Sequence, residues 1–314
     1  MPILITAICL FILIVPGFLI GLNFTYKTAF HSDRSIKANP YKGFDTSSED
    51  ERVKCVVSSI KENVELPCER VYITSRDGLR LSARYVHARD GAPVDIMAHG
   101  YRSTSFTDFA GISKVAIKMG HNMLLIDQRA HAESEGKVIS YGVKERLDVI
   151  DWTRYIIERF GEDTRIFYFG VSMGAATVLM AAAEENLPKN VVGVLADCPF
   201  SAGLDIIKLV AKGKGPASFI AGPLACIGAR LGGFNLNETT AVRAAANIKI
   251  PTLLVHGDKD GFVPYCMSEK IAAANPDIIF ETYDSCEHAL SYFSDEERYT
   301  KMLTDFCDGV LKQS

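Results

Sequence analysis

Ser172 is the residue whose surroundings most clearly indicate chemistry. It lies in the pentapeptide from Gly170 to Gly174, Gly-Val-Ser-Met-Gly, between an apolar run over residues 166–169 and an Ala-rich stretch with helical patterning. A strand that turns this abruptly into a helix strains the serine backbone and presents its hydroxyl at the end of the strand, and the glycines let the chain pass closely on either side. The pattern indicates a nucleophile elbow; a glycine-rich turn without chemistry is the alternative.

Two other stretches offer the partners that a serine nucleophile needs. A serine hydroxyl becomes reactive when a base takes its proton, and the base needs a carboxylate that fixes its tautomer. Asp260 lies in an acidic loop after the apolar run 252–255, with Asp258 as the alternative acid, and His288 follows the last strand pattern. Because each candidate follows a predicted strand, their joint occurrence favours a catalytic triad over three unrelated surface residues.

With these motifs the chain resembles a serine hydrolase of the α/β-hydrolase superfamily. It is most similar to the esterase and serine-aminopeptidase-like branch, which includes monoacylglycerol-lipase-like and cinnamoyl-esterase-like enzymes. The resemblance covers nearly everything from Cys68 to Leu311. In that branch the motif HGxxDxxVP carries the acid, which implies Asp260 rather than Asp258. The family histidine follows the last strand, which implies His288.

The resemblance also implies an oxyanion hole made by two backbone N–H groups, those of Tyr101 and Met173. Tyr101 follows the family's His-Gly pair, in which we expect His99 to brace the loop. A second family motif, DxRGHGxSxG, corresponds to residues 127–136, where alanines replace both glycines around the histidine. We expect that histidine, His131, to be a structural residue beneath the oxyanion turn and not a second base.

The activity that the resemblance implies is hydrolysis of a small-molecule carboxylic ester through an acyl-enzyme intermediate. A peptidase or amidase acting on short peptides is the alternative, since the same triad serves both. A catalytically silent binding protein with a hydrolase fold is a further alternative, although binding alone has no need of a complete triad. We expect no cofactor and no metal, because the sequence has no P-loop, no dinucleotide fingerprint after the first strand and no HExxH motif.

The elements that must position these residues alternate between strand and helix patterns. After a hairpin over residues 69–87, the alternation predicts a mostly parallel eight-stranded sheet with helices on both faces, the α/β-hydrolase fold. It stops over residues 201–247, which predicts a short helical cap insertion at the carboxyl edge of the sheet. The last helix is expected to begin at Ser294, with Glu297 completing a capping box. Strands are expected at residues 69–74, 79–87, 94–98, 123–126, 165–169, 191–196, 252–255 and 278–283.

The N-terminus has a different composition. Residues 2–22 are apolar apart from Thr6 and carry no charge, and a helix of that length spans about 30 Å, the thickness of a bilayer's hydrocarbon core. We therefore expect a transmembrane anchor over residues 1–23, with a cleaved signal peptide as the alternative. The basic residues that follow the run predict a cytoplasmic catalytic domain. Residues 24–66 are expected to form a linker and N-terminal extension, and residues 67–314 the catalytic domain.

The remaining composition narrows the class of protein. A net charge of −4 leaves no basic surplus to neutralise phosphates, so no nucleic-acid partner is expected. Seven cysteines follow the predicted anchor, an odd number with no CxxC spacing. This usage favours free thiols over a disulfide framework or a zinc site.

Overall fold

The computed structural model describes residues 15–32, 39–41, 43–212 and 216–313. Its centre is an eight-stranded sheet with the order β1-β2-β4-β3-β5-β6-β7-β8. The hairpin of β1 and β2 pairs antiparallel with the rest through β4, and all other pairs are parallel. The strands are β1 (Glu69–Thr74), β2 (Arg80–Val86), β3 (Val94–Ala98), β4 (Asn122–Asp127), β5 (Ile166–Val171), β6 (Val191–Asp197), β7 (Thr252–Gly257) and β8 (Ile279–Tyr283). The predicted mostly parallel, eight-stranded sheet is confirmed.

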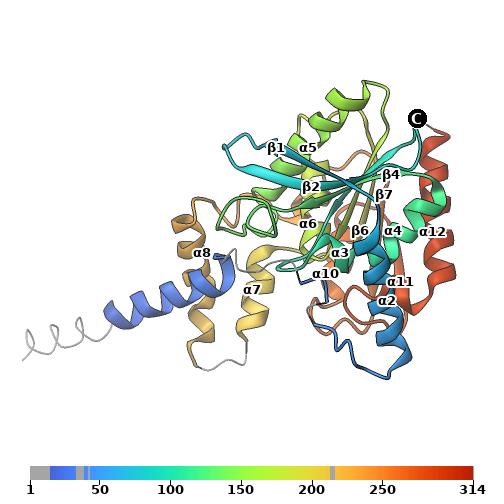
Figure 1. The fold of residues 1–314 in the computed structure, drawn as a ribbon. Coiled ribbons are helices and arrows are strands. Elements are labelled where there is room, and N and C mark those ends of the chain that lie inside the picture. Colours follow the sequence, from blue (N-terminus) through green and yellow to red (C-terminus); the bar gives the residue numbers. More distant parts are fainter. Residues whose placement is uncertain (1–14, 33–38, 42, 213–215, 314) are drawn as a thin grey trace, which may run out of the picture.

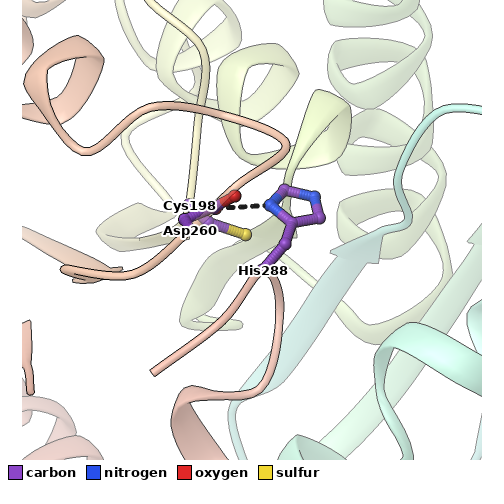
Figure 2. A group of neighbouring side chains, drawn as sticks. All are labelled: Cys198, Asp260 and His288. Atoms are coloured by element: carbon purple, nitrogen blue, oxygen red, sulfur yellow. Dashed lines mark hydrogen bonds and ion pairs between the residues drawn. The ribbon is translucent and has the colours of Figure 1, made fainter. Parts of the chain in front are cut away.

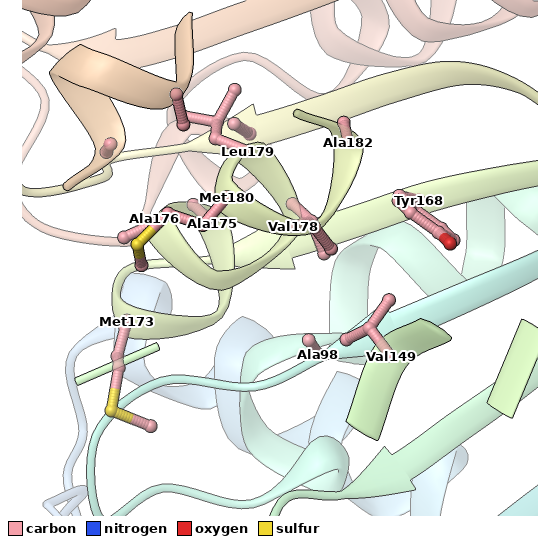
Figure 3. Close-up of a cluster of buried hydrophobic side chains, with 14 of the residues drawn as sticks. Ala98, Val149, Tyr168, Met173, Ala175, Ala176, Val178, Leu179, Met180 and Ala182 are labelled. Carbon is pink, nitrogen blue, oxygen red and sulfur yellow. The ribbon is translucent and has the colours of Figure 1, made fainter. Parts of the chain in front are cut away.

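Helices cover both faces of this sheet (Figure 1). The strands β3 to β7 are buried along their whole length, as parallel strands between two helical layers must be. One layer packs α5 (Glu145–Phe160), α6 (Met173–Ala182) and α10 (Cys266–Ala274) on the sheet, and the other packs α4 (Ala110–Met119) and α12 (Glu296–Leu311). Every residue of α6 is buried, and Figure 3 shows its apolar side chains in a cluster that also includes Ala98, Val149 and Tyr168.

The segment predicted to interrupt the alternation is helical. It contains α7 (Gly203–Ala211), η2 (Pro216–Ile220), α8 (Ala221–Leu231) and α9 (Ala241–Ala245), and no strand in the part that the structure describes. The helices α7 and α8 pack against each other, whereas α9 packs on α6 and α10. The predicted helical cap is therefore formed mainly by α7 and α8.

The last helix begins later than the sequence predicts. Asp295 is the N-cap of α12, and its carboxylate accepts a hydrogen bond of 2.9 Å from the backbone N–H of Arg298. Ser294, the predicted cap, closes the short preceding helix α11 (Ser291–Ser294), where its hydroxyl donates to the carbonyl of Ser291. The prediction was wrong because Ser294 and Asp295 are adjacent and both are favourable N-cap residues. Asp295, which directly precedes α12, is the one that caps it.

The N-terminal helix is bound to the domain at its end. Residues 15–25 are helical and continue into η1 (Tyr26–Phe30), and Figure 1 shows this helix beside α8. The side chain of Phe30 is fully buried against Tyr141 and Phe234. Next to it, His31 forms a β-bridge with Val138. We use "N-terminal helix" below for residues 15–30.

The predicted transmembrane anchor over residues 1–23 is wrong. Residues 1–14 lie outside the described residues, and none of the described helices is both long enough and apolar enough to span a bilayer. The apolar run had been extrapolated as one spanning helix, but its described part leads into the polar stretch with Asn23, Thr25 and Lys27 and ends against the domain. The predicted membrane partner and the predicted cytoplasmic placement rested on this anchor and are not supported.

Before the sheet, the chain forms one further helix, α2 (Glu51–Glu65). Asp50 caps it by accepting a hydrogen bond of 2.8 Å from the backbone N–H of Arg52. Its buried residues Val56 and Ile60 pack against Ala110 at the start of α4. A single-turn helix, α3 (Ser105–Asp108), follows the loop after β3 and contributes a residue to the candidate site.

Candidate active site

Ser172 occupies a strained turn between β5 and α6. Its backbone angles are φ 56° and ψ −116°, a left-handed φ that costs free energy in any residue other than glycine. The turn is possible because its neighbours lack side chains: a β-carbon on Gly174 would lie 1.7 Å from the carbonyl oxygen of Ala98, and one on Gly170 would lie 2.4 Å from that of Gly174. The close approach of the turn to β3 therefore requires Gly174, and its close approach to the start of α6 requires Gly170.

The structure brings Ser172, His288 and Asp260 together from three separate parts of the sheet. Ser172 follows β5, Asp260 follows β7 and His288 follows β8, so the parallel strands deliver all three to one edge. His288 Nε2 lies 3.0 Å from Ser172 Oγ, and His288 Nδ1 lies 2.6 Å from Asp260 Oδ2. Since a carboxylate only accepts, Nδ1 carries the proton and Nε2 is the acceptor for the serine hydroxyl.

Asp260 is held as an anion by its surroundings. Its Oδ1 accepts hydrogen bonds of 2.8 Å from the backbone N–H groups of Phe262 and Val263, and its Oδ2 also contacts His256 Nε2 at 3.1 Å. Burial opposes ionisation, but the hydrogen bonds from His256 and His288 outweigh it, so the pKa of the Asp260 carboxyl lies well below its usual range. Asp258, the alternative acid, instead accepts a hydrogen bond of 2.6 Å from the backbone of Ser285.

The loop after β3 passes beside Ser172 and carries the backbone N–H of Tyr101. The N–H of Gly100 donates to Asp108 Oδ2 at 2.6 Å, and that of Arg102 donates to His131 Nε2 at 3.0 Å. Between them, the N–H of Tyr101 has no hydrogen-bond partner among the described residues. The N–H of Met173, the first residue of α6, likewise has no intrahelical acceptor available. These are the two groups that the sequence assigns to an oxyanion hole.

Two buried histidines support this loop. His99 Nδ1 donates to the carbonyl of Gly100 at 2.9 Å, and its Nε2 accepts from the backbone N–H of Gln128. Burial, with the neighbouring His131, lowers the pKa of His99 to about 3. The His131 ring packs edge-on against it at 4.8 Å and bonds the carbonyl of Arg129. Both rings thus have every nitrogen occupied by the backbone, as expected of structural residues.

Asp108 is a site residue that the sequence reasoning missed. Its carboxylate is partly buried, accepts the Gly100 N–H and also accepts the Ser103 hydroxyl at 2.5 Å. Burial raises the pKa of this carboxyl. The sequence carries no signal for the role, since Asp108 reads as an ordinary polar residue of a short helix. Its position shows instead that it fixes the turn on which Tyr101 is presented.

Cys198 lies next to the carboxylate of Asp260, as Figure 2 shows. One ligand atom from each of Cys198, Asp260 and His288 falls within 4.8 Å of the others, a spacing that a metal ion would allow. Burial and the charges of Asp197 and Asp260 raise the pKa of the Cys198 thiol well above its ordinary value, and metals bind the thiolate. In this group Asp260 already accepts a hydrogen bond from His288.

A cavity of about 340 Å³ opens at Ser172. Its walls include residues of the N-terminal helix, of the cap helices and of the loop that carries Asp260, together with Tyr101 and Tyr141. The side chains are mostly apolar, and they include Phe24, Phe200, Ile206, Val210, Ala221 and Phe262. The contribution of the N-terminal helix was not foreseen from the sequence. We call this cavity the acyl pocket, after the role that is proposed for it below.

Comparison with known proteins identifies the fold. No protein-family model matches the chain. The uncharacterized protein YqkD of Bacillus subtilis is 26% identical over 76% of this chain and 78% of its own length. The thiohydrolase aneE of Aspergillus aculeatus is 29% identical over 44% of each chain. Among solved structures, the esterase Pf2001 of Pyrococcus furiosus superposes with a TM-score of 0.63, at 23% identity, over 80% of this chain and 95% of that one. The chain has the α/β-hydrolase fold, as its motifs imply.

Proposed function

We propose that this α/β-hydrolase-fold protein is a serine hydrolase that cleaves carboxylic esters through an acyl-enzyme intermediate. One observation carries the proposal: the continuous hydrogen-bonded line from Ser172 Oγ through the His288 ring to Asp260, with contacts of 3.0 and 2.6 Å. That arrangement gives the hydroxyl a base, and gives the base an anion that fixes its tautomer and stabilises its charged form.

In the first half of the reaction, Ser172 Oγ attacks the ester carbonyl carbon while its proton moves to His288 Nε2. The carbonyl oxygen becomes an oxyanion, which the N–H groups of Tyr101 and Met173 are free to bind. Collapse of the tetrahedral intermediate breaks the bond to the alcohol oxygen, and His288 donates its proton to that oxygen. The alcohol leaves, and the acyl group remains on Ser172.

In the second half, water enters in place of the alcohol. His288 Nε2 takes a proton from the water as its oxygen attacks the acyl carbon, and the same two N–H groups bind the second oxyanion. Collapse then releases the carboxylic acid, and the proton on His288 returns to Ser172 Oγ. Asp260 stays ionised throughout, which agrees with the direction of its pKa shift.

Esters are favoured as substrates by the acyl pocket, which offers an apolar surface next to Ser172. The names of the esterase Pf2001 and the thiohydrolase aneE support a hydrolytic activity. A peptidase acting on short peptides remains the second candidate, since the same groups would attack an amide. Comparison of an ester with the matching thioester and anilide distinguishes the three substrates.

The test is hydrolysis of p-nitrophenyl butanoate by the purified full chain. Ser172→Ala should lower kcat by about 10⁴-fold or more, with the melting temperature retained. Ser58→Ala, which changes an exposed serine of α2, is the matched control and should behave as the parent protein. Loss of folding in Ser172→Ala, or equal turnover by the two variants, would contradict the proposal.

A further inference from the structure

We propose that residues 24–32 form one wall of the acyl pocket and part of its opening, and that this wall selects esters with a linear aliphatic acyl chain. The inference rests on the proposed serine hydrolase function and adds a substrate class to it. Phe24, Thr25, Thr28 and Ala29 line the same cavity as Ser172. The cap residues Ile206 and Val210 line the cavity as well.

The loop after β3 that carries Tyr101 and Arg102, called the oxyanion loop below, holds this segment in place. The Tyr101 hydroxyl lies 3.0 and 2.9 Å from the carbonyl oxygens of Thr28 and Ala29. Arg102 Nη2 donates to the carbonyls of Thr28 at 3.0 Å and His31 at 2.8 Å. The last carbonyls of a helix lack intrahelical partners and carry partial negative charge, so a guanidinium is a favourable cap for them. The two residues that follow Gly100 therefore bind the end of the N-terminal helix.

The same segment is anchored on its other side. Phe30 is fully buried between Tyr141 and Phe234, and its carbonyl accepts the N–H of Ile139 at 2.8 Å. The Ser32 hydroxyl donates to the carbonyl of Ala130 at 2.6 Å. This wall therefore contacts the oxyanion loop on one side and the loop before α5 on the other. Because both sides are fixed, residues 24–32 are a defined part of the site.

The chemistry of the wall indicates the acyl group. Phe24, Val210 and Phe262 are 66%, 43% and 49% exposed around the pocket mouth, so three apolar side chains face water there. Of the four residues with side-chain hydroxyls that line the pocket apart from Ser172, Tyr101 and Thr28 already bind helix carbonyls, at 2.9 Å to Ala29 and 2.8 Å to Phe24. An aliphatic chain would cover the apolar side chains without needing a polar partner, whereas a phenolic or charged acyl group would lose its hydration.

The test compares p-nitrophenyl acetate, butanoate, octanoate and dodecanoate on the full chain. The parent protein should prefer octanoate over acetate in kcat/KM. Phe24→Ala should lower the octanoate-to-acetate ratio by about fivefold, and Thr28→Phe, which fills the pocket, by roughly tenfold. Phe18→Ala is the matched control, because Phe18 is 43% exposed on the same helix and does not line the pocket. Its ratio should equal that of the parent protein.

The outcomes separate this inference from the function on which it rests. Fluorophosphonate labelling of Ser172 and turnover of acetate, with ratios unchanged in both Phe24→Ala and Thr28→Phe, would overturn the inference and leave the serine hydrolase intact. A ratio that falls equally in Phe18→Ala would also overturn it, since the effect would then belong to the whole helix. Absence of Ser172 labelling in the parent protein would remove the proposed function itself.

Discussion

Ser172 belongs to two regions of different construction. The elbow packs backbone against backbone, with the space for a β-carbon on Gly174 occupied by the carbonyl of Ala98. The acyl pocket is made of side chains from distant segments, and Phe24, Val210 and Phe262 are partly exposed there. The first region tolerates almost no change in geometry, whereas the second can exchange side chains without disturbing the sheet. The contrast suggests that the reaction is fixed by the elbow and the substrate by the pocket.

From this contrast follows a general expectation that experiments can test. Changes around the elbow should reduce turnover of every ester alike or destabilise the fold, and changes in the pocket should alter the preference among esters. A substitution that does both would show that the two regions act as one.

The largest effect is expected at the acid. Asp260→Asn should lower kcat by about 10⁴-fold for short and long esters alike, because an amide can hold His288 in the wrong tautomer. Asp258→Asn supplies a matched control two residues away, since Asp258 contacts the backbone of Ser285 and not His288. Steady-state kinetics on acetate and octanoate esters provide the measurement. Equal losses in the two variants would remove Asp260 from the triad.

The next effect concerns folding. Gly174→Ala should destabilise the protein by about 3 kcal/mol or more, since the added methyl must displace the backbone of β3. Gly309→Ala, in α12, places a methyl in open space and should stabilise the protein by up to about 1 kcal/mol. Urea unfolding gives both values. A Gly174→Ala variant as stable as its parent would show that the elbow is less constrained than the backbone packing implies.

Asp108 tests the loop between the two regions. Asp108→Ala leaves the Gly100 N–H and the Ser103 hydroxyl without their acceptor, so kcat should fall by about 100-fold with little change in KM. Asp108→Asn retains one acceptor oxygen and should recover part of the loss. Acetate and octanoate should be affected equally. A shift in chain-length preference would instead assign Asp108 to the acyl pocket.

Much of the elbow region could be predicted from the sequence, and little of the pocket. The strands, the elbow and the order of Ser172, Asp260 and His288 are visible because each depends on a short stretch of chain with its own pattern. The bracing positions of His99 and His131 agree with the prediction for the same reason. The catalytic roles themselves stay predictions until they are measured.

The pocket could not be predicted because its contacts join segments far apart in the chain. Nothing in the local sequence relates Arg102 to the carbonyls of residues 28 and 31, or Phe30 to Phe234. The apolar N-terminal run predicted a membrane span because hydropathy depends on composition alone. It does not show whether apolar side chains pack against lipid or against the rest of the protein. Asp108 was missed because a single carboxylate has no pattern.

The smallest effect is a pH dependence of stability beneath the elbow. Asp197 is buried, its carbonyl accepts the Ser172 N–H, and burial raises the pKa of its carboxyl to about 6. The folded state therefore holds a proton that the unfolded state releases at about pH 4. Relative to Asp197→Asn, the free energy of unfolding should fall by on the order of 2 kcal/mol as the pH rises from about 4 to about 7.

The control for this measurement lies in the cap. Asp205 of α7 is exposed, and Asp205→Asn should leave the pH profile of urea unfolding as it is in the parent protein. An Asp197→Asn profile parallel to that of the parent would show that this carboxyl keeps an ordinary pKa. Asp197 would then not be a source of the pH dependence of the protein's stability.

The most direct test of the central claim is covalent labelling of the nucleophile. The full chain, treated with a fluorophosphonate and digested, should carry one phosphonyl group on the peptide that contains Ser172. Asp260→Asn should label far more slowly, and the label should be absent from Ser172→Ala. Modification of another serine, or equal labelling rates in the parent protein and Asp260→Asn, would contradict the account of Ser172 as an activated nucleophile.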